Sequence, residues 1–192
     1  IIMQIIYRFF LGQIDDFSWI AQKKLSNSDV PNFEKSAAYN LAKEKLIKSG
    51  CSEDNIYGII DGILDAEFSG IKSHGFHYLP IYCNHLKIGK IKGKAAPSYE
   101  KISNSAIKVN ADNGFAHSAI NIGLPLFFEM CAKEAISCMS VYNSYNCGVL
   151  GFHTKRIAEK GFIGLGFTNA PASIAPLGGV KPVVGTNPFS LA

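Results

Sequence analysis

The second half of the chain alternates between strand-like and helix-like patterns, and this alternation restricts the fold more than any other feature. Residues 102–110 predict a strand, and residues 119–136 predict a helix that Pro125 kinks or restarts. The next three elements are predicted as a strand, a helix and a strand, over residues 138–143, 148–159 and 162–168. Such alternation is typical of α/β proteins, so we expect a mixed α/β domain over residues 101–192. The sequence stops within a strand, at Ser190-Leu191-Ala192, and we expect this domain to be incomplete at its C-terminus.

The preceding residues predict a helical segment. From Asn32 the apolar residues follow helical spacing until Gly50 closes the helix. Ser52 is expected to cap a second helix that runs to about Phe68, and a non-helical loop then leads into a third, shorter helix. We therefore expect a helical N-terminal segment over residues 32–100, which contains that loop.

Residues 1–31 show no clean period, and we interpret them as an appendage of uncertain status. They end at Pro31, which favours an extended backbone at the residue before it and breaks any preceding helix. Gln4 and Arg8 interrupt the apolar start of the chain, so the pattern does not favour a signal peptide.

Charge and cysteine content argue against several classes of protein. The net charge is only +4 and the lysines are dispersed, so we expect no nucleic-acid partner. No apolar run is long enough to cross a bilayer, so we expect no membrane partner. Five cysteines without a CxxC pair indicate neither a disulfide framework nor a zinc site, and a reducing cytoplasm fits them best.

The first candidate for acid–base chemistry is His74, which lies in Ser73-His74-Gly75 in the loop after the second helix. A histidine beside a glycine in a loop can present its ring to a ligand and exchange protons near neutral pH. The alternative is a histidine that caps a helix or lies in solvent. His77 could pair with it on a metal ion, but no acidic or thiol ligand is spaced to complete such a site. We therefore expect no metal.

The second candidate is His117, which the turn Asp112-Asn113-Gly114 delivers to the start of an apolar helix. A helix N-terminus lowers the pKa of a histidine, which suits a neutral acid–base catalyst or a donor to a carbonyl group. The alternative is a half-buried residue at the end of the helix.

The third candidate is the stretch 168–188, which follows a strand and is rich in Gly, Pro and small polar residues. A long, apolar, non-helical stretch of this kind favours a ligand loop lined by backbone. The alternative is an irregular connection stabilised by packing. A Rossmann fingerprint is not indicated, because its nearest match, residues 161–166, has the wrong spacing and lies inside a predicted strand.

Three motifs, in this order, resemble the malate/L-lactate dehydrogenase family over about residues 32–192. The first is Ser73-His74-Gly75 with Leu79-Pro80 and Tyr82, and the second is Asp112-Asn113-Gly114 with His117. The third is Phe167-Thr168-Asn169 with Ala175-Pro176, Gly178-Gly179 and Gly185-Thr186-Asn187-Pro188. One such motif is weak evidence, whereas three in register are specific.

The resemblance implies a homodimeric oxidoreductase that transfers a hydride between NAD or NADP and C2 of a 2-oxo acid. Its fold would be a helical segment followed by a mixed α/β nicotinamide-binding domain that lacks a Rossmann unit. The implied acid–base residues are His74 and His117. The substrate would contact Ser73, Tyr78, Thr186 and Asn187. The cofactor would contact Ser144, Asn146, Thr168, Asn169, Pro176, Gly178 and Gly179.

Three positions depart from the family pattern. The family usually has an arginine that holds the substrate carboxylate at the position of Tyr78, and a tyrosine cannot form the same charged, bidentate pair. An arginine and a histidine are also usual at the positions of Tyr142 and Asn146. These departures imply an altered substrate, with a different anion-holding group such as a lysine. They also leave open a catalytically degenerate protein of the same fold that binds a small molecule or cofactor.

Overall fold

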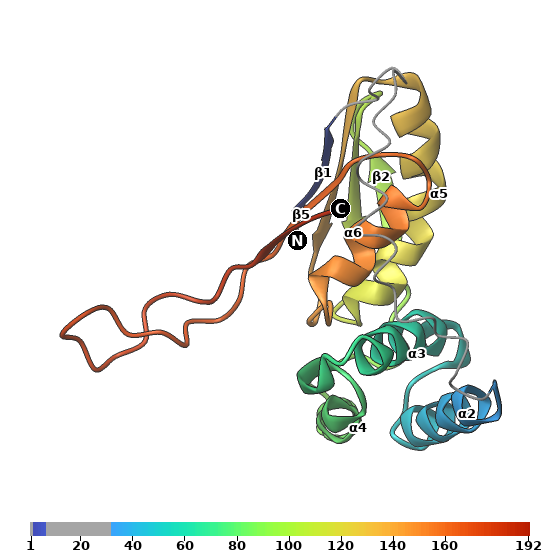
Figure 1. Ribbon diagram of the computed structural model, residues 1–192, viewed down its shortest axis with the longest axis vertical. Helices are drawn as coiled ribbons and strands as arrows, with labels where there is room; N and C mark the ends of the chain where they lie inside the picture. The colour runs from blue at the N-terminus through green and yellow to red at the C-terminus, as the bar shows by residue number, and fades with distance from the viewer. Residues whose placement is uncertain (1, 7–31) are drawn as a thin grey trace.

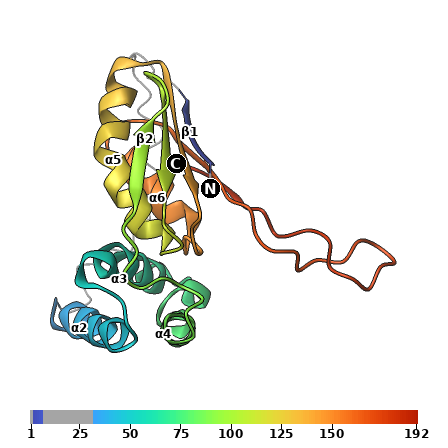
Figure 2. The ribbon, with the colours of Figure 1, turned by 180° about the vertical axis from the view of Figure 1, so that it is seen from behind.

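The computed structural model describes residues 2–6 and 32–192, with side chains from residue 35 onward. The helices of the first part lie together at one end of the sheet that the second part forms (Figure 1). Figure 2 shows from behind that α5 runs along the sheet, while α2, α3 and α4 stay grouped at its end. This arrangement agrees with the expected order of a helical segment and then a mixed α/β domain.

The helical segment follows the predicted pattern closely. Helix α2 (Asn32–Lys48) ends before Gly50, whose φ of +97° lies in the region that glycine tolerates best. Helix α3 (Glu53–Phe68) buries one apolar side, and α4 (Leu79–Lys87) follows two short 3₁₀ turns, η2 (Lys72–His74) and η3 (Phe76–Tyr78). The buried residues of the three helices form one apolar core cluster.

Ser52 occupies the N-cap position of α3 as predicted, but its side chain does not cap the helix. Its Oγ instead donates to the carbonyl of Gly93 at 3.3 Å, and the Asn55 amide donates to the same carbonyl at 3.2 Å. These bonds hold the turn that follows α4 against the start of α3. The Ser52 hydroxyl is used by the Gly93 carbonyl and therefore does not cap the helix.

The second part is a six-stranded mixed sheet in the order β2-β3-β4-β1-β5-β6. Its strands are β1 (Ile2–Ile6), β2 (Ser98–Lys101), β3 (Ala106–Asn110), β4 (Ile136–Tyr142), β5 (Gly164–Phe167) and β6 (Phe189–Leu191). Only β3 and β4 pair in parallel, with Lys108 opposite Ser140, and every other pair is antiparallel. The short segment β1 pairs with both β4 and β5, although it belongs to the predicted appendage. The rest of that appendage lies outside the described residues.

Two helices cover one face of this sheet. Helix α5 (Ala116–Lys133) packs on β3 and β4, and α6 (Leu150–Ala158) packs on β5 and β6. Their buried residues share a second core cluster with those of β3 and β4, including Phe127 and Met139. Pro125 lies inside α5, which continues past it, so the prediction that the helix restarts there is wrong. Packing of the apolar residues on both sides of Pro125 outweighs the loss of one backbone donor.

The predicted strand 102–110 is shorter in the structure, because residues 102–105 turn back to pair β3 with β2. All four residues of β2 are exposed, so this edge strand has no alternating apolar pattern that would predict it.

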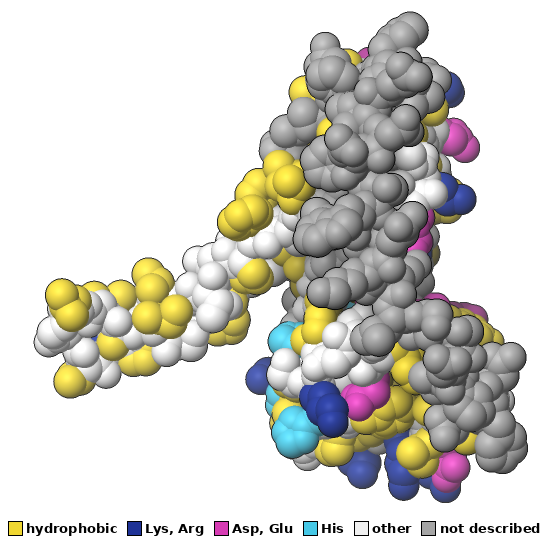
Figure 3. Space-filling view, in the orientation of Figure 1, with side chains coloured by type: hydrophobic (Ala, Val, Ile, Leu, Met, Phe, Trp, Pro, Cys, Tyr) yellow, Lys and Arg dark blue, Asp and Glu magenta, His cyan; other side chains and the backbone are white. Residues whose placement is uncertain are grey.

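Residues 168–188 leave the sheet as a long two-sided extension, red in Figure 1, which we call the arm. A β-bridge between Ile174 and Val184 joins its two sides midway, and further hydrogen bonds join them at the base. Apolar side chains line the arm (Figure 3), and Leu177 and Val180 near its tip are almost fully exposed. None of the helices that the structure describes is both long and apolar enough to cross a membrane.

Candidate active site in the cleft between the helices and the sheet

A cleft of about 910 Å³ brings together residues from the first and third sequence motifs and from the loop after β4. It lies where η2, η3 and α4 face the loop after β4 and the base of the arm. The lining residues are His74, Tyr78, His85, Lys90, residues 141–148, residues 168–171, Thr186 and Pro188. Of the residues predicted to contact ligands, seven meet here: His74, Tyr78, Ser144, Asn146, Thr168, Asn169 and Thr186.

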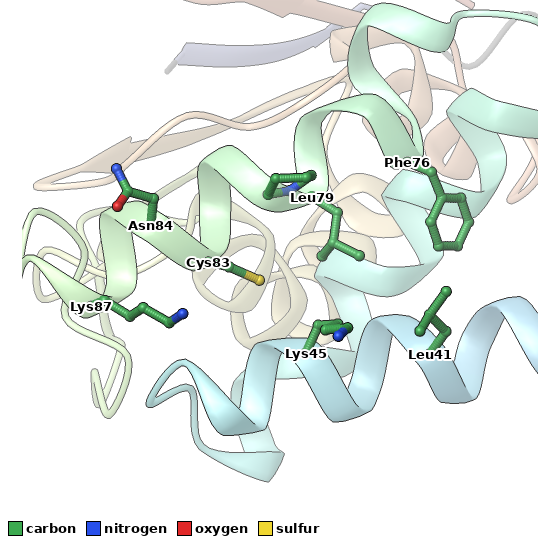
Figure 4. Close-up of a pocket in the computed structure, with 8 residues that line it drawn as sticks. Leu41, Lys45, Phe76, Leu79, Cys83, Asn84 and Lys87 are labelled. Carbon is green, nitrogen blue, oxygen red and sulfur yellow. The ribbon is translucent and has the colours of Figure 1, made fainter.

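A second hollow, of about 490 Å³, lies between α2 and α4 (Figure 4). Leu41, Phe76 and Leu79 give it an apolar lining, and Lys45 and Lys87 point into it from opposite helices. None of the predicted site residues lines it. The larger cleft is therefore the candidate active site.

The Asp112-Asn113-Gly114 turn shapes the cleft wall instead of lining it. Asp112 and Asn113 both have positive φ, and the Asn113 amide donates to the carbonyl of Asn143 at 2.7 Å. The Tyr145 amide donates to the carbonyl of Gly114 at 2.8 Å. These two backbone bonds hold loop 143–148 in place at the end of β4.

His74 reaches the cleft from the end of η2 and is half-buried. Its Nδ1 lies 3.0 Å from the hydroxyl of Ser73, and its ring stacks on Tyr78 at 6.1 Å with an interplanar angle of 8°. Gly75 permits this turn because a Cβ there would collide with Glu67, whose carboxylate accepts the Phe76 amide at 2.9 Å. Ser73 orients the ring but does not itself line the cleft.

His117 starts α5 as predicted but lies behind the cleft wall, with only 2% of its surface exposed. Burial lowers the pKa of His117 well below its ordinary value of 6.5, and the neighbouring His153 and Arg156 add to this effect. The predicted direction of the pKa shift is therefore right, but desolvation is its main cause. Gly148, which lines the cleft, lies directly against the ring, since a Cβ at that position would lie 3.2 Å from Nε2 of His117.

Gly148 is needed both for its backbone and for the space beside His117. Its φ is +64°, and Gly161 has a similar φ of +81° with nothing within 4 Å of an added Cβ. We expect Gly161→Ala to cost about 1–2 kcal/mol of unfolding free energy from backbone strain. Gly148→Ala should cost about 1 kcal/mol more, because its methyl group presses on the His117 ring. Urea denaturation of both variants checks this, and equal losses would contradict the contact with His117.

His153 holds the cleft wall from inside. Its Nε2 bonds the carbonyl of Cys147 at 2.8 Å, so this nitrogen carries the proton, and its ring centre lies 5.1 Å from that of His117. Burial lowers the pKa of His153 to about 4. Nδ1 of each of the two rings is buried without a hydrogen-bond partner among the described residues. A positive charge on either ring would therefore be poorly compensated.

The stability of the protein is expected to fall as the pH falls from about 6.5 toward 4. The folded pKa of His153 is depressed, so the unfolded chain binds the proton first and stability is lost through this window. Between pH 7 and pH 5 the His153 contribution is roughly 2 kcal/mol. Between pH 7 and pH 5 the unfolding free energy of His153→Gln should therefore fall by roughly 2 kcal/mol less than that of the wild type. His77 is exposed, and His77→Gln should show the same fall as the wild type. Identical pH slopes for all three proteins would exclude this role of His153.

Aromatic side chains also support the cleft wall formed by loop 143–148. The Tyr82 hydroxyl donates to Oδ1 of Asn146 at 2.8 Å, and the Gly148 amide donates to the same oxygen at 3.0 Å. The Tyr145 ring meets Tyr82 edge-to-face at 6.0 Å, and its hydroxyl lies 2.6 Å from Nδ1 of His85. Asn146 therefore uses its carbonyl oxygen within the protein, which leaves its amide nitrogen for a ligand.

The departures from the family pattern are accommodated by aromatic packing. Tyr78 lies edge-to-face on Tyr82 at 4.9 Å and adds to the raised pKa of Tyr145. Tyr142 is exposed at the end of β4, where the Lys108 ammonium lies 4.6 Å from its ring centre. Neither tyrosine brings a positive charge to the cleft.

The arm contributes only its base to the cleft. Thr168, Asn169 and Thr186 line it, and Oδ1 of Asn187 accepts the Ala170 amide at 2.8 Å, which ties the two sides of the base together. Four predicted contact residues of the arm do not line the cleft: Pro176, Gly178, Gly179 and Asn187. Asn187 has a structural role, while the other three lie beyond the bridge between Ile174 and Val184, toward the tip of the arm.

Sequence reasoning missed His85, Lys90 and Tyr145, which also line the cleft. The Gly/Lys-rich turn after α4 is the only signal for Lys90, and no local pattern marks the other two. The cleft is large enough for a nicotinamide cofactor with a small substrate, and its lining residues include no carboxylate that would repel phosphates. On these grounds its residues fit such a cofactor.

Comparison with known proteins gives relatives of one kind. Residues 33–192 match the family described as malate/L-lactate dehydrogenase. The (2R)-3-sulfolactate dehydrogenase (NADP(+)) of Chromohalobacter salexigens is 34% identical over 130 residues, which are 68% of this chain and 39% of that protein. Delta(1)-pyrroline-2-carboxylate reductase 1 of Burkholderia ambifaria is 31% identical over 152 residues, which are 79% of this chain and 45% of that protein.

A solved structure agrees with these relatives. The malate dehydrogenase from Entamoeba histolytica has a TM-score of 0.75 at 28% identity, covering 82% of this chain and 44% of that one. This chain thus spans less than half the length of the proteins it matches. The family match extends over most of its sequence, from the first described helix to the end. By these matches the predicted resemblance is confirmed, and the chain belongs to the malate/L-lactate dehydrogenase family.

Proposed function

We propose that this protein is an oxidoreductase that transfers a hydride between NAD(P)H and C2 of a 2-oxo acid, giving the 2-hydroxy acid. The observation that carries the proposal is the convergence of the first and third motifs on one cleft, whose wall the second motif supports and whose lining includes a half-buried histidine. The relatives support it, since their names refer to sulfolactate, malate and a cyclic imino acid, Δ1-pyrroline-2-carboxylate. All of these compounds carry a carboxylate beside the carbon that is oxidised or reduced.

The cleft residues divide between the cofactor and the substrate. Ser144, the Asn146 amide and the base of the arm at Thr168 and Asn169 would hold the cofactor. When bound, the nicotinamide supplies or accepts the hydride. Thr186 and Tyr78, on opposite sides of the cleft, would contact the substrate. The proposal names the class of cofactor, a nicotinamide dinucleotide, and does not choose between NAD and NADP.

His74 is the residue we assign to the proton. It lines the cleft, and Ser73 engages its Nδ1, so that Nε2 can face the substrate oxygen. In reduction the ring would donate a proton to that oxygen, and in oxidation it would remove one. His117 is less suited to direct contact, because it is buried behind Gly148 and its pKa is depressed.

A second candidate is a protein of the same fold that binds the ligand without turnover. It is favoured by Tyr78, Tyr142 and Asn146, which replace charged or titratable family residues, and by the burial of His117. Cofactor binding without oxidation of that cofactor would identify it.

The test is oxidation of NADH and of NADPH by the purified protein with pyruvate, oxaloacetate, 2,3-diketogulonate, sulfopyruvate and Δ1-piperideine-2-carboxylate. Cofactor binding is followed separately by nicotinamide fluorescence. Turnover with at least one acid is expected. Fluorescence that does not change at millimolar cofactor would refute the oxidoreductase, because hydride transfer requires the bound nicotinamide.

A homodimer and a reducing cytoplasm are further parts of the proposal. The homodimer rests on the family resemblance. The compartment rests on the cysteines, all five of which are free. Light scattering and localisation of a tagged protein test these two points.

A further inference from the structure

The charge of the cleft lining is carried by one residue. The lining includes no aspartate, glutamate or arginine, and its single lysine is Lys90. The two histidines of the lining, His74 and His85, each have a ring nitrogen engaged by a neighbouring hydroxyl. A negatively charged ligand in this cleft therefore meets Lys90 as its one permanent positive side chain among the lining residues.

The Tyr145 hydroxyl of the cleft lining is already engaged by a neighbouring side chain. It lies 2.6 Å from Nδ1 of His85. Burial raises the pKa of Tyr145, with Tyr78 adding to the shift, so the Tyr145 hydroxyl stays uncharged at neutral pH. It can orient an anion but supplies no fixed charge to hold it.

Backbone hydrogen bonds on both sides of Lys90 fix the position of its Cα atom. Gly89, with φ of +72°, ends α4 by donating its amide to the carbonyl of Leu86 at 3.1 Å. Ile91 is 1% exposed, and its amide donates to the carbonyl of His85 at 3.1 Å. Lys90 lies between these two anchors, and none of the ion pairs within residues 35–192 includes it. Its ammonium group is thus available to a ligand.

We infer that Lys90 binds the carboxylate of the acid substrate, in place of a cation at the position of Tyr78. This rests on the proposed function, because it assumes that the ligand of the cleft is a carboxylate. A lysine is a point charge on a flexible stem, whereas a guanidinium grips a carboxylate in a fixed, planar geometry. Such a site selects for the presence of a carboxylate more than for its exact orientation.

The experiment compares Lys90→Met and Lys90→Arg with a matched control, Lys87→Met. Lys87 lies three residues away and points into the hollow between α2 and α4 (Figure 4), away from the cleft lining. In Lys90→Met the KM for the best 2-oxo acid is expected to rise roughly 10- to 100-fold, with a much smaller change in kcat. Lys90→Arg should recover most of this loss, and Lys87→Met should behave as the wild type.

Binding of oxamate, a carboxylate that cannot be reduced at C2, separates this inference from the proposed function. Calorimetry with oxamate in the presence of saturating NADH should show the same 10- to 100-fold weakening in Lys90→Met, even if no acid is turned over. Turnover with unchanged oxamate affinity and KM in Lys90→Met would overturn the inference while leaving the oxidoreductase intact. Absence of oxamate binding to the wild type would also overturn it.

The cofactor is the other source of negative charge. If Lys90 held a phosphate of the cofactor, Lys90→Met would weaken NADPH or NADH and leave oxamate unaffected. The Kd of each cofactor, measured by fluorescence without oxamate, distinguishes the two sources. We expect both Kd values to change less than threefold, and a larger loss confined to NADPH would assign Lys90 to its 2′-phosphate and overturn the carboxylate assignment.

Discussion

Replacing His74 with alanine is expected to lower kcat with the best 2-oxo acid by roughly 10²- to 10⁴-fold, the usual contribution of a positioned acid–base group. The loss should fall on turnover and not on cofactor affinity, because His74 enters the cleft from η2, across from the predicted cofactor residues of loop 143–148. Steady-state kinetics gives the first quantity and nicotinamide fluorescence the second.

The control for this change is His77→Ala. His77 is in the next 3₁₀ turn, is exposed, and does not line the cleft. It should keep wild-type kinetics. Added imidazole is expected to restore part of the activity of His74→Ala, since a small base can occupy the space that the ring leaves. Activity of His74→Ala within threefold of the wild type would show that the proton comes from another group, and His117 behind Gly148 would be the next to test.

The parts of the fold that were predictable are those in which one side of an element is buried. Strands β3 and β4 alternate buried and exposed residues, and α5 is apolar enough for its pattern to stand out despite Pro125. Edge strand β2 was not predicted because all of its residues are exposed, so its sequence has no alternation of apolar and polar residues. The pairing of β1 with β4 and β5 could not be predicted either, since the partners are at least 130 residues apart and nothing local indicates the match.

The residues of the candidate site that could be predicted are those that lie in short sequence motifs. His74 and the base of the arm carry short motifs, and they line the cleft as expected. Lys90 and His85 were missed because each is placed by tertiary contacts, the first by an anchored turn and the second by Tyr145. The structure places His117 away from the cleft lining, although its motif predicts a ligand contact. Helix α5 instead turns the ring inward against Gly62 and Gly148, where its burial depends on glycines from other elements.

Phe115→Ala is expected to cause the largest loss of stability. The side chain is 2% exposed and lies at the N-cap of α5, yet it belongs to the core cluster of the helical segment. It meets Tyr82 edge-to-face at 5.2 Å and Tyr145 at 5.9 Å. One ring therefore joins α4, the start of α5 and the cleft wall, and no neighbouring side chain can replace these contacts without moving an element.

Truncating a buried phenylalanine costs about 3–5 kcal/mol, a large share of the 5–15 kcal/mol that stabilises a typical domain. The free energy of unfolding, measured by urea denaturation with circular dichroism, should fall by that amount in Phe115→Ala. Tyr99→Ala, in β2 and 52% exposed, should change it by less than about 0.5 kcal/mol. Because Tyr145 packs on Phe115, the same variant should also weaken oxamate binding by disturbing the wall beside His85. A loss of stability below about 1 kcal/mol would mean that the helical segment and the sheet are joined elsewhere, and that the cleft does not depend on this ring.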